Sequence, residues 1–256
     1  MISLNDTIIR DIKRTNSNYF ISGPCSFESY EELYGICLKL KHMGVKFIRA
    51  GVFKPRTSPY SFQGIGEQGI NIIKRIKDEL NIKFVVELTT IEQINKFSEI
   101  IDIIQIGSRN MYNYELLKMV GKTDKPVLLK RGLSATIQEW LMAAEYIAKE
   151  GNTNIILCER GIRSFDPETR NVLDLQSVPV VKKLCNLPII VDPSHASGRS
   201  DIVEAMSRAA IACGADGLII ESHTNPKLSK SDADQTISMS VLKRIKLFYD
   251  RFKKNN

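Results

Sequence analysis

The sequence predicts a single (β/α)₈ barrel, and three observations lead to this fold class. Eight short apolar runs alternate with eight longer amphipathic stretches along the 256 residues. The runs are continuously apolar, which is typical of strands buried in a parallel sheet. Eight such units in about 250 residues is the usual size of a closed barrel. An open doubly wound sheet is the alternative, but no GxGxxG fingerprint follows the first expected strand.

We expect a strand in each apolar run and a helix in each amphipathic stretch. The expected strands span 19–25, 46–51, 83–88, 102–107, 126–131, 154–160, 187–192 and 217–222. The expected helices span 31–44, 65–80, 91–100, 113–122, 136–151, 177–184, 201–214 and 236–252. We expect residues 1–18 to form a short arm or hairpin that closes the bottom of the barrel, and residues 19–256 to form the catalytic barrel.

Composition and charge narrow the class of protein. The five cysteines are scattered and form no CxxC pair, which indicates a reduced, cytoplasmic chain. We find no signal-peptide core and no apolar stretch near the roughly 20 residues of a membrane span. The net charge of +7 has two explanations, solubility or anionic ligands. The basic residues are spread out and no nucleic-acid motif appears, so we expect no nucleic-acid or membrane partner.

Ionisable or nucleophilic side chains follow every expected strand, at the end where barrels of this kind carry their active sites. In chain order they are Cys25; Arg49, Lys54 and Arg56; Glu87; Ser108 and Arg109; Lys130 and Arg131; Glu159 and Arg160; Asp192 and His195; Glu221 and His223. Grouped buried cations are costly unless anions accompany them, and phosphates and carboxylates suit Arg and Lys. The set predicts an anionic substrate, although any single cation could instead form an ion pair with a neighbouring carboxylate.

A second set at the same end of the barrel has the character of metal ligands. It consists of Cys25, His195, Glu221 and Asp232. A thiolate, an imidazole and two carboxylates together suit a borderline divalent ion such as manganese, iron, cobalt or zinc. Taken singly, Cys25 could be a small buried hydrophobic residue and His195 a turn residue, because no local spacing signature joins the four. The prediction of a metal site therefore depends on the whole set.

Several long motifs resemble those of the 3-deoxy-7-phosphoheptulonate (DAHP) synthases, in the short, unregulated form of the type Iβ, 3-deoxy-manno-octulosonate 8-phosphate synthase-like branch. They are GPCSFES, RAGVFKPRTSPYSFQGIGEQG, IGSRNMYN, LLKRGLSATIQEWLMAAEYI, CERGIRSF, TRNVLDL and DPSHASGRSD, which match in order from about residue 18 to about residue 250. The resemblance implies a transferase that condenses phosphoenolpyruvate with erythrose 4-phosphate and water. The products would be 3-deoxy-D-arabino-heptulosonate 7-phosphate and phosphate, in the first step of the shikimate pathway to chorismate and the aromatic amino acids.

The resemblance also implies roles for individual residues. Cys25, His195, Glu221 and Asp232 would hold the metal, Mn²⁺ or alternatively Fe²⁺, Co²⁺ or Zn²⁺. Phosphoenolpyruvate would be bound by Arg49, Lys54, Arg109, Lys130 and Arg160, and by the backbone N–H of Ser108. The aldose phosphate would be held by Arg56 and Thr57.

Further roles are hypotheses about the chemistry. Asp192 would hydrogen-bond a sugar hydroxyl or orient His195. Lys54 would donate a proton to the new alkoxide, and Glu87 would orient the attacking water. Cys25 and His195 would take part in catalysis through the metal, which would polarise the aldehyde oxygen.

Other functions remain open at this point. A 3-deoxy-manno-octulosonate 8-phosphate synthase, which uses arabinose 5-phosphate, carries a KANRSS-like segment where this chain has KPRTS at 54–58. A sialic-acid-type synthase lacks that loop, and a non-catalytic phosphate-binding barrel would need no Cys and His. About 18 residues precede the first expected strand, so we expect no regulatory domain and no inhibition by phenylalanine or tyrosine. The resemblance also implies a homotetramer or homodimer.

Overall fold

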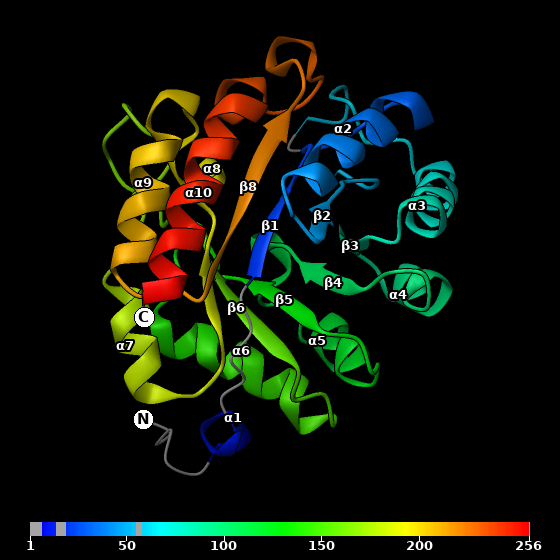
Figure 1. Cartoon of the computed structure of the whole chain (residues 1–256). Helices are drawn as coiled ribbons and strands as arrows, with labels where there is room; N and C mark the ends of the chain where they lie inside the picture. The colour runs from blue at the N-terminus through cyan, green and yellow to red at the C-terminus, as the bar shows by residue number, and fades with distance from the viewer. Residues whose placement is uncertain (1–6, 14–18, 55–57, 256) are drawn as a thin grey trace.

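The computed structural model describes residues 7–13, 19–54 and 58–255, which form a closed parallel barrel (Figure 1). Each strand pairs with the next along the chain, and β1 also pairs with β8, with Ile21 opposite Ile219. The strands are β1 (Tyr19–Gly23), β2 (Phe47–Arg49), β3 (Lys83–Glu87), β4 (Ile103–Ile106), β5 (Val127–Lys130), β6 (Ile155–Glu159), β7 (Ile189–Val191) and β8 (Gly217–His223). The expected (β/α)₈ class is confirmed, and the open sheet is excluded because the sheet closes on itself.

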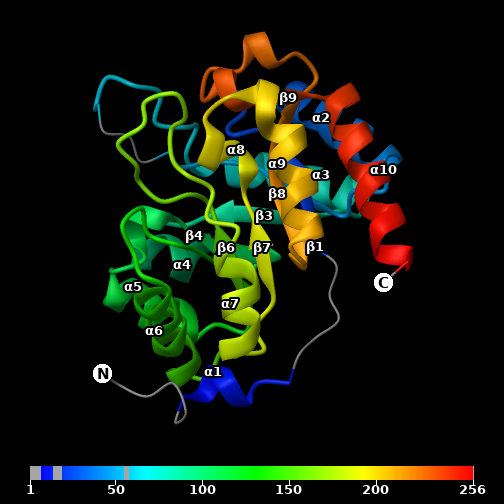
Figure 2. The ribbon, with the colours of Figure 1, turned by 90° about the vertical axis from the view of Figure 1, so that its left-hand side faces the viewer.

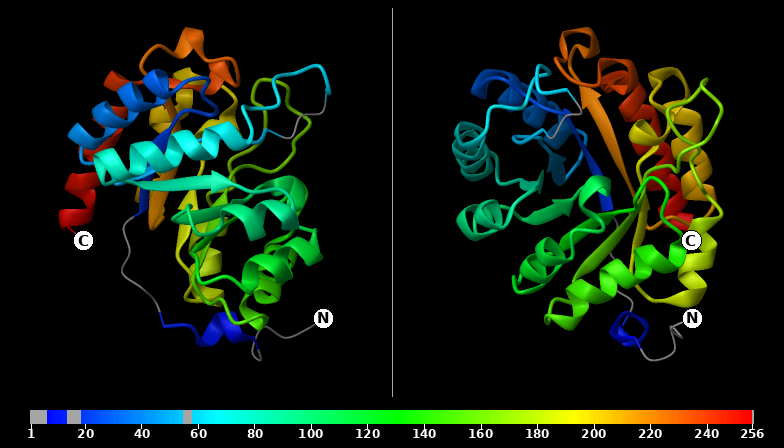
Figure 3. Two further views of the ribbon diagram at one scale, coloured as in Figure 1. Left: turned by 90° about the vertical axis from the view of Figure 1, so that its right-hand side faces the viewer. Right: turned by 180° about the vertical axis from the view of Figure 1, so that it is seen from behind.

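Helices between the strands surround the barrel (Figures 1 and 3). They are α2 (Tyr30–His42), α3 (Glu67–Leu80), α4 (Ile91–Phe97), α5 (Tyr114–Gly121), α6 (Ile137–Lys149), α7 (Ser177–Leu184), α9 (Ser200–Ala212) and α10 (Met239–Asn255). Polar caps fix several of their starts, because a side-chain oxygen accepts a backbone N–H of the first turn. Thr136 and Glu139 form a full capping box at α6. No helix in the described ranges is long and apolar enough to cross a membrane.

Several short elements were not expected from the sequence. Helix α8 (Pro193–Ser197) carries His195 in a segment where no helix was expected, and α9 then begins at Ser200 without a side-chain cap. Strand β9 (Ile237–Ser238) pairs with the end of β8 and takes up the start of the last expected helix. Helix α1 (Ile8–Asp11) lies below the barrel in Figure 2, at the end opposite α8. Residues 1–6 and 14–18 of the expected arm lie outside the described residues.

The strands have apolar cores on both of their faces, since consecutive side chains of a strand point to opposite faces. The barrel interior is filled by Tyr19, Ile21, Val85, Ile103, Leu128, Ile156, Cys158, Ile190 and Ile219. The alternate positions, such as Phe84 and Ile104, pack in a larger core that includes residues of the helices. This double burial explains why the strands read as continuous apolar runs.

The same alternation produces a polar layer at the carboxyl end of the barrel. Two residues beyond the inward apolar side chains come Arg49, Glu87, Gln105, Lys130, Arg160, Asp192 and Glu221. All of these except Glu87 are buried. The fold therefore places one polar side chain from each of seven strands at the mouth.

Candidate metal and substrate site

A cavity of about 550 Å³ opens at the carboxyl ends of the strands. Nine of the predicted site residues line it: Arg49, Lys54, Glu87, Ser108, Arg109, Lys130, Arg160, His195 and Asp232. Cys25, Asp192 and Glu221 do not line it and are fully buried. Arg56 and Thr57 lie outside the described residues. The structure thus gathers the other predicted residues around one cavity.

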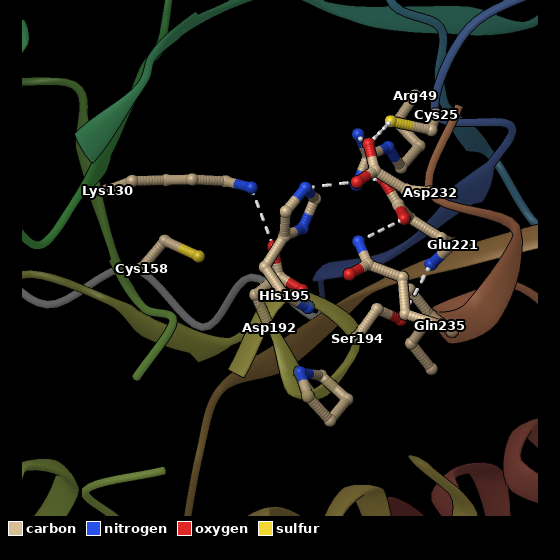
Figure 4. Close-up of polar contacts among 12 residues, drawn as sticks. Cys25, Arg49, Lys130, Cys158, Asp192, Ser194, His195, Glu221, Asp232 and Gln235 are labelled. Carbon is tan, nitrogen blue, oxygen red and sulfur yellow. Dashed lines mark hydrogen bonds and ion pairs between the residues drawn. The ribbon is translucent and has the colours of Figure 1, made fainter. Parts of the chain in front are cut away.

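The four predicted metal ligands come together beside this cavity. One ligand atom from each of Cys25, His195, Glu221 and Asp232 lies within 4.8 Å of all the others. Figure 4 shows the four side chains converging from separate segments. The donors are sulfur, nitrogen and oxygen, which fits a borderline divalent ion.

His195 is held in the orientation that a metal ligand needs. Asp192 accepts the backbone N–H of His195 at 2.9 Å and caps α8, while its Oδ2 lies 2.7 Å from His195 Nδ1. Burial lowers the pKa of His195, although Asp192 and Glu221 oppose the shift. A neutral ring that donates Nδ1–H to Asp192 leaves the lone pair of Nε2 free to bind a metal. These contacts are those of a residue that orients His195, which is one of the two roles expected for Asp192.

Glu221 has one oxygen that suits a cation. Gln235 donates a short hydrogen bond to Oε2, and Ser194 accepts the backbone N–H of Glu221 at 3.0 Å. Oε1 lies 3.0 Å from Arg49 Nη2 and 3.3 Å from His195 Nε2, but it accepts no well-directed hydrogen bond within the described part of the chain. A buried carboxylate oxygen in this state can still accept a cation.

Cys25 is packed between a cation and an anion. Lys54 Nζ lies 2.7 Å from Cys25 Sγ, and Sγ lies 2.9 Å from Asp232 Oδ2. Burial and then Glu221 raise the pKa of the Cys25 thiol to about 12, more than Lys54 and Arg49 lower it. The thiol is therefore protonated until a metal replaces its proton.

Asp232 is presented to the site by an unusual backbone conformation. It is one of two non-glycine residues with positive φ in the described ranges, at φ 55° and ψ 36°. Thr236 Oγ1 donates to the carbonyl of Asp232 at 2.9 Å, and the neighbouring Ser231 bonds Ser26 at 2.6 Å. A left-handed aspartate costs about 1 kcal/mol or more, and the loop must compensate for that cost.

Four buried cations form the deep wall of the cavity: Arg49, Lys54, Lys130 and Arg160. Lys130 is paired with Asp192 at 2.6 Å. Among the described residues, however, Nε and Nη1 of Arg49 and Nη1 of Arg160 have no hydrogen-bond partner. Burial lowers the pKa of Arg160, so its charge is poorly compensated by protein groups. Buried guanidinium donors without acceptors fit an anionic ligand with several oxygens.

Glu87 reaches the cavity across a glycine. A methyl group added at Gly107 would lie 2.0 Å from Glu87 Oε1, so only glycine leaves room for the carboxylate. Ser108 follows and begins a short 3₁₀ turn, η2 (Ser108–Asn110). Its hydroxyl is buried and has no partner in the part of the chain that the structure describes.

Several residues of the site were missed by the sequence analysis. Gln105, Arg163, Arg170 and Asn171 line the cavity, and Gln235 supports Glu221. The period of two along β4 was the signal for Gln105, because that residue is two positions beyond the inward Ile103. Arg163, Arg170 and Asn171 lie in a loop and Gln235 ends a short 3₁₀ turn, η4 (Ala233–Gln235), so none of them carries a periodic signal.

Arg131 was expected at the mouth, but it points away from the cavity. Its Nη1 bonds Glu159 Oε2 at 2.9 Å and Asp174 Oδ2 at 2.7 Å, and its Nε donates to the carbonyl of Ala135. Glu159 also accepts the backbone N–H of Gly161 at 2.6 Å. For Arg131 the ion-pair alternative is the correct one, and the pair joins the ends of β5 and β6.

The fold and the site together define a class of protein: (β/α)₈ barrels with a cationic cavity beside a group of potential metal ligands. The particular group is given by comparison with known proteins. A family model described as the DAHP synthetase I family matches residues 6–255, and the chain belongs to this family.

Individual relatives agree with that assignment. The chain is 49% identical over 243 residues to a phospho-2-dehydro-3-deoxyheptonate aldolase of Thermotoga maritima, covering 94% of this chain and 72% of that protein. It is 29% identical over 249 residues to a 2-dehydro-3-deoxyphosphooctonate aldolase of Geobacter sulfurreducens, covering 88% of this chain and 90% of that protein. The crystal structure of the Thermotoga maritima DAHP synthase matches with a TM-score of 0.90 and 45% identity, covering 99% of this chain and 73% of that one.

Proposed function

We propose that this chain is a DAHP synthase, which condenses phosphoenolpyruvate, erythrose 4-phosphate and water into 3-deoxy-D-arabino-heptulosonate 7-phosphate and phosphate. The observation that carries the proposal is the group of four potential metal ligands, two of which line the cavity, beside the four buried cations that line the same cavity. The high identity to the Thermotoga maritima enzyme supports the same reaction rather than the octulosonate one.

The deep cations bind phosphoenolpyruvate in this proposal. The free donors of Arg49 and Arg160 pair with its phosphate and carboxylate oxygens, while Lys54 and Lys130 add positive charge. Arg109 and the backbone N–H of Ser108 line the same cavity and complete the set. Fixing the three-carbon substrate in attack geometry lowers the barrier by up to roughly 7–11 kcal/mol.

The new carbon–carbon bond joins C3 of phosphoenolpyruvate to the aldehyde carbon of the sugar. A divalent ion held by Cys25, His195, Glu221 and Asp232 would supply Lewis-acid polarisation of the aldehyde oxygen. Lys54, whose Nζ borders this group, donates a proton to the oxygen that becomes a hydroxyl.

Water then adds at C2, and phosphate leaves by cleavage of the C–O bond. Glu87 borders the cavity and its carboxylate is held close to Gly107, where it can orient that water and accept its proton. Asp192 keeps His195 in place and neutralises Lys130. The aldose phosphate is assigned to Arg56 and Thr57 on the resemblance alone.

We propose Mn²⁺ as the ion, with Fe²⁺, Co²⁺ or Zn²⁺ as alternatives. The ligand set contains one soft and three harder donors, so it does not select among these ions by type alone. Elemental analysis of protein purified without added metal identifies the native ion.

We also propose that the enzyme works in the cytoplasm as a homo-oligomer, either a homotetramer or a homodimer. All five cysteines are unpaired, and a site that depends on a free thiol suits a reducing compartment. Sedimentation analysis of the purified protein determines the oligomeric state.

A phosphate-release assay tests the proposed reaction. Purified protein with Mn²⁺ and phosphoenolpyruvate is given erythrose 4-phosphate or arabinose 5-phosphate, and phosphate and the keto acid product are measured. We expect release that depends on erythrose 4-phosphate, with at least a tenfold lower kcat/KM for arabinose 5-phosphate. The reverse preference would favour the octulosonate reaction, and binding of phosphoenolpyruvate without release would favour a non-catalytic barrel.

A further inference from the structure

We propose that Arg163 and Arg170 form a second, outer anion site that receives the terminal phosphate of the sugar substrate. Both arginines line the same cavity as the deep cations, but neither has a role in the reaction described so far. The inference rests on the proposed function and adds a residue pair that determines the choice of a phosphorylated sugar.

The two arginines lie at the base of a hairpin between β6 and α7, which we call the β6–α7 hairpin (residues 162–172). Ile162 and Val172 pair across its base, with both N–H···O contacts at 2.9 Å. Arg163 N donates to the carbonyl of Leu133 at 2.8 Å, and Arg170 N donates to that of Ser197 at 3.0 Å. The backbone that carries both arginines is therefore tied to the rest of the barrel mouth.

The hairpin is also joined to the helix that carries His195. Asn171 N donates to the carbonyl of Ala196 at 2.9 Å, and Asn171 Nδ2 donates to that of His195 at 3.2 Å. Arg170 Nη1 lies 3.5 Å from Oδ1 of Asp232, one of the potential metal ligands. A sugar with its aldehyde beside these ligands would therefore have Arg170 next to it.

The charge of these two arginines is poorly neutralised. Arg163 is exposed, and its side chain has neither a hydrogen bond nor an ion pair within the described ranges. The contact of Arg170 with Asp232 is long, and the Arg170 side chain is 43% exposed, so water screens the pair. Two guanidinium groups at one mouth raise the local concentration of a dianion such as a phosphate monoester.

The opposite wall of the mouth comes from the loop between β2 and α3. Ser58 and Ser61 of that loop line the same cavity as the two arginines. Figures 1 and 3 show this loop and the β6–α7 hairpin on opposite sides of the same end of the barrel, and Figure 2 shows both rising above it. The expected aldose-phosphate residues Arg56 and Thr57 belong to this loop, although they lie outside the described residues. The phosphate would then be held between two walls.

Kinetics of Arg163→Gln test the inference, because Arg163 touches none of the potential metal ligands. KM and kcat are measured for each substrate with saturating amounts of the other. Arg251→Gln is the matched control, since it removes the same charge from the exposed face of α10. We expect Arg163→Gln to raise KM for erythrose 4-phosphate roughly 10- to 100-fold, the range of a lost charged hydrogen bond, with less than a threefold change for phosphoenolpyruvate. Arg163→Lys should recover part of the loss.

Two further measurements test the outer site: turnover of unphosphorylated erythrose and direct binding of erythrose 4-phosphate. With erythrose, Arg163→Gln and the unchanged protein should have the same kcat/KM, because the lost partner is a phosphate. An equal loss with both sugars, or a rise in KM for phosphoenolpyruvate instead, would overturn the inference. If the unchanged protein releases no phosphate from phosphoenolpyruvate and erythrose 4-phosphate, the proposed function is wrong, whether or not the outer site exists. In that case calorimetry still tests the outer site, by comparing the Kd of erythrose 4-phosphate for Arg163→Gln with that for the unchanged protein. Equal Kd values would reject the outer site.

Discussion

Cys25 is the residue whose chemistry depends most on its surroundings. Its thiol is fully buried, and burial raises its pKa to about 12. Only a cation that replaces the thiol proton makes this sulfur a thiolate near neutral pH. In the proposed site the Cys25 side chain therefore acts only when an ion has displaced its proton.

Removal of the metal should abolish activity. We expect exhaustive chelation to leave less than a few per cent of the phosphate release, and Mn²⁺ to restore it. Cys25→Ser keeps the size of the side chain but replaces the soft sulfur donor. The metal affinity of this variant should fall by more than the roughly 10- to 100-fold that is typical when a residue supporting a metal ligand is lost. Elemental analysis and calorimetry measure both effects. Full activity of a protein that contains no metal would contradict the assignment of the four ligands.

Gly107 and Glu87 should behave as one unit. Because a methyl group at Gly107 would lie 2.0 Å from Glu87 Oε1, Gly107→Ala must displace the carboxylate. We expect a fall in kcat of roughly 100-fold or more, similar to that of Glu87→Gln. The double variant should lose little more than either single variant.

Gly35→Ala is the control for this prediction, since nothing lies within 4 Å of an added methyl group in helix α2. It should leave kcat unchanged. Additive losses in the Gly107 and Glu87 variants would indicate that the glycine acts on another part of the cavity.

At the scale of elements, α8 is the feature that the sequence analysis described incorrectly. Asp192 followed by Pro193 is a recognised helix start, with a capping side chain and proline in the first turn. A helix of five residues is too short for a periodic pattern, so no helix was expected in this segment. The strands were predictable for the opposite reason, because each apolar run carries its own signal.

The α8 helix predicts a specific effect of Asp192→Asn. The amide oxygen can still cap the helix, but the negative charge beside His195 and Lys130 is lost. We expect metal affinity to fall roughly 10- to 100-fold with a small change in melting temperature. Calorimetric titration with Mn²⁺ and thermal unfolding separate the two effects.

Asp201→Asn supplies the matched control. This carboxylate begins the next helix and pairs with Arg199 at the surface, far less buried than Asp192. Its metal affinity should equal that of the unchanged protein. A large loss of stability in Asp192→Asn without any loss of metal affinity would assign Asp192 to the fold alone.

At the scale of the whole molecule, closure of the barrel depends on contact between β1 and β8. A methyl group added at Gly217 would lie 1.9 Å from the carbonyl oxygen of Tyr19. Gly217→Ala must therefore separate the strands where the barrel closes, and we expect it to cost about 3 kcal/mol or more. Urea unfolding followed by the fluorescence of the single, buried Trp140 measures this loss. Unchanged stability would show that the closing strands can shift at little cost.

The barrel and the deep site were predictable because they follow from local patterns. The apolar runs predict the strands, and the residues that follow each run predict the side chains at the mouth of the barrel. The outer residues Arg163 and Arg170, and the buried Gln235, were not predictable in this way. Their positions depend on how loops fold back over the mouth, as in the contact of Gln235 with Glu221. No short-range pattern in the sequence encodes such long-range contacts.

The spacing of the four proposed metal ligands along the chain has a consequence for biosynthesis. Cys25 follows the first strand, whereas Glu221 lies in the eighth strand and Asp232 follows it. A polypeptide emerging from the ribosome at roughly 5–20 residues per second therefore carries one of the four ligands for most of its synthesis. In the proposed site, all four ligands come together only after the last strand has joined the first. Metal content would then report the fraction of chains that have been completed and correctly closed.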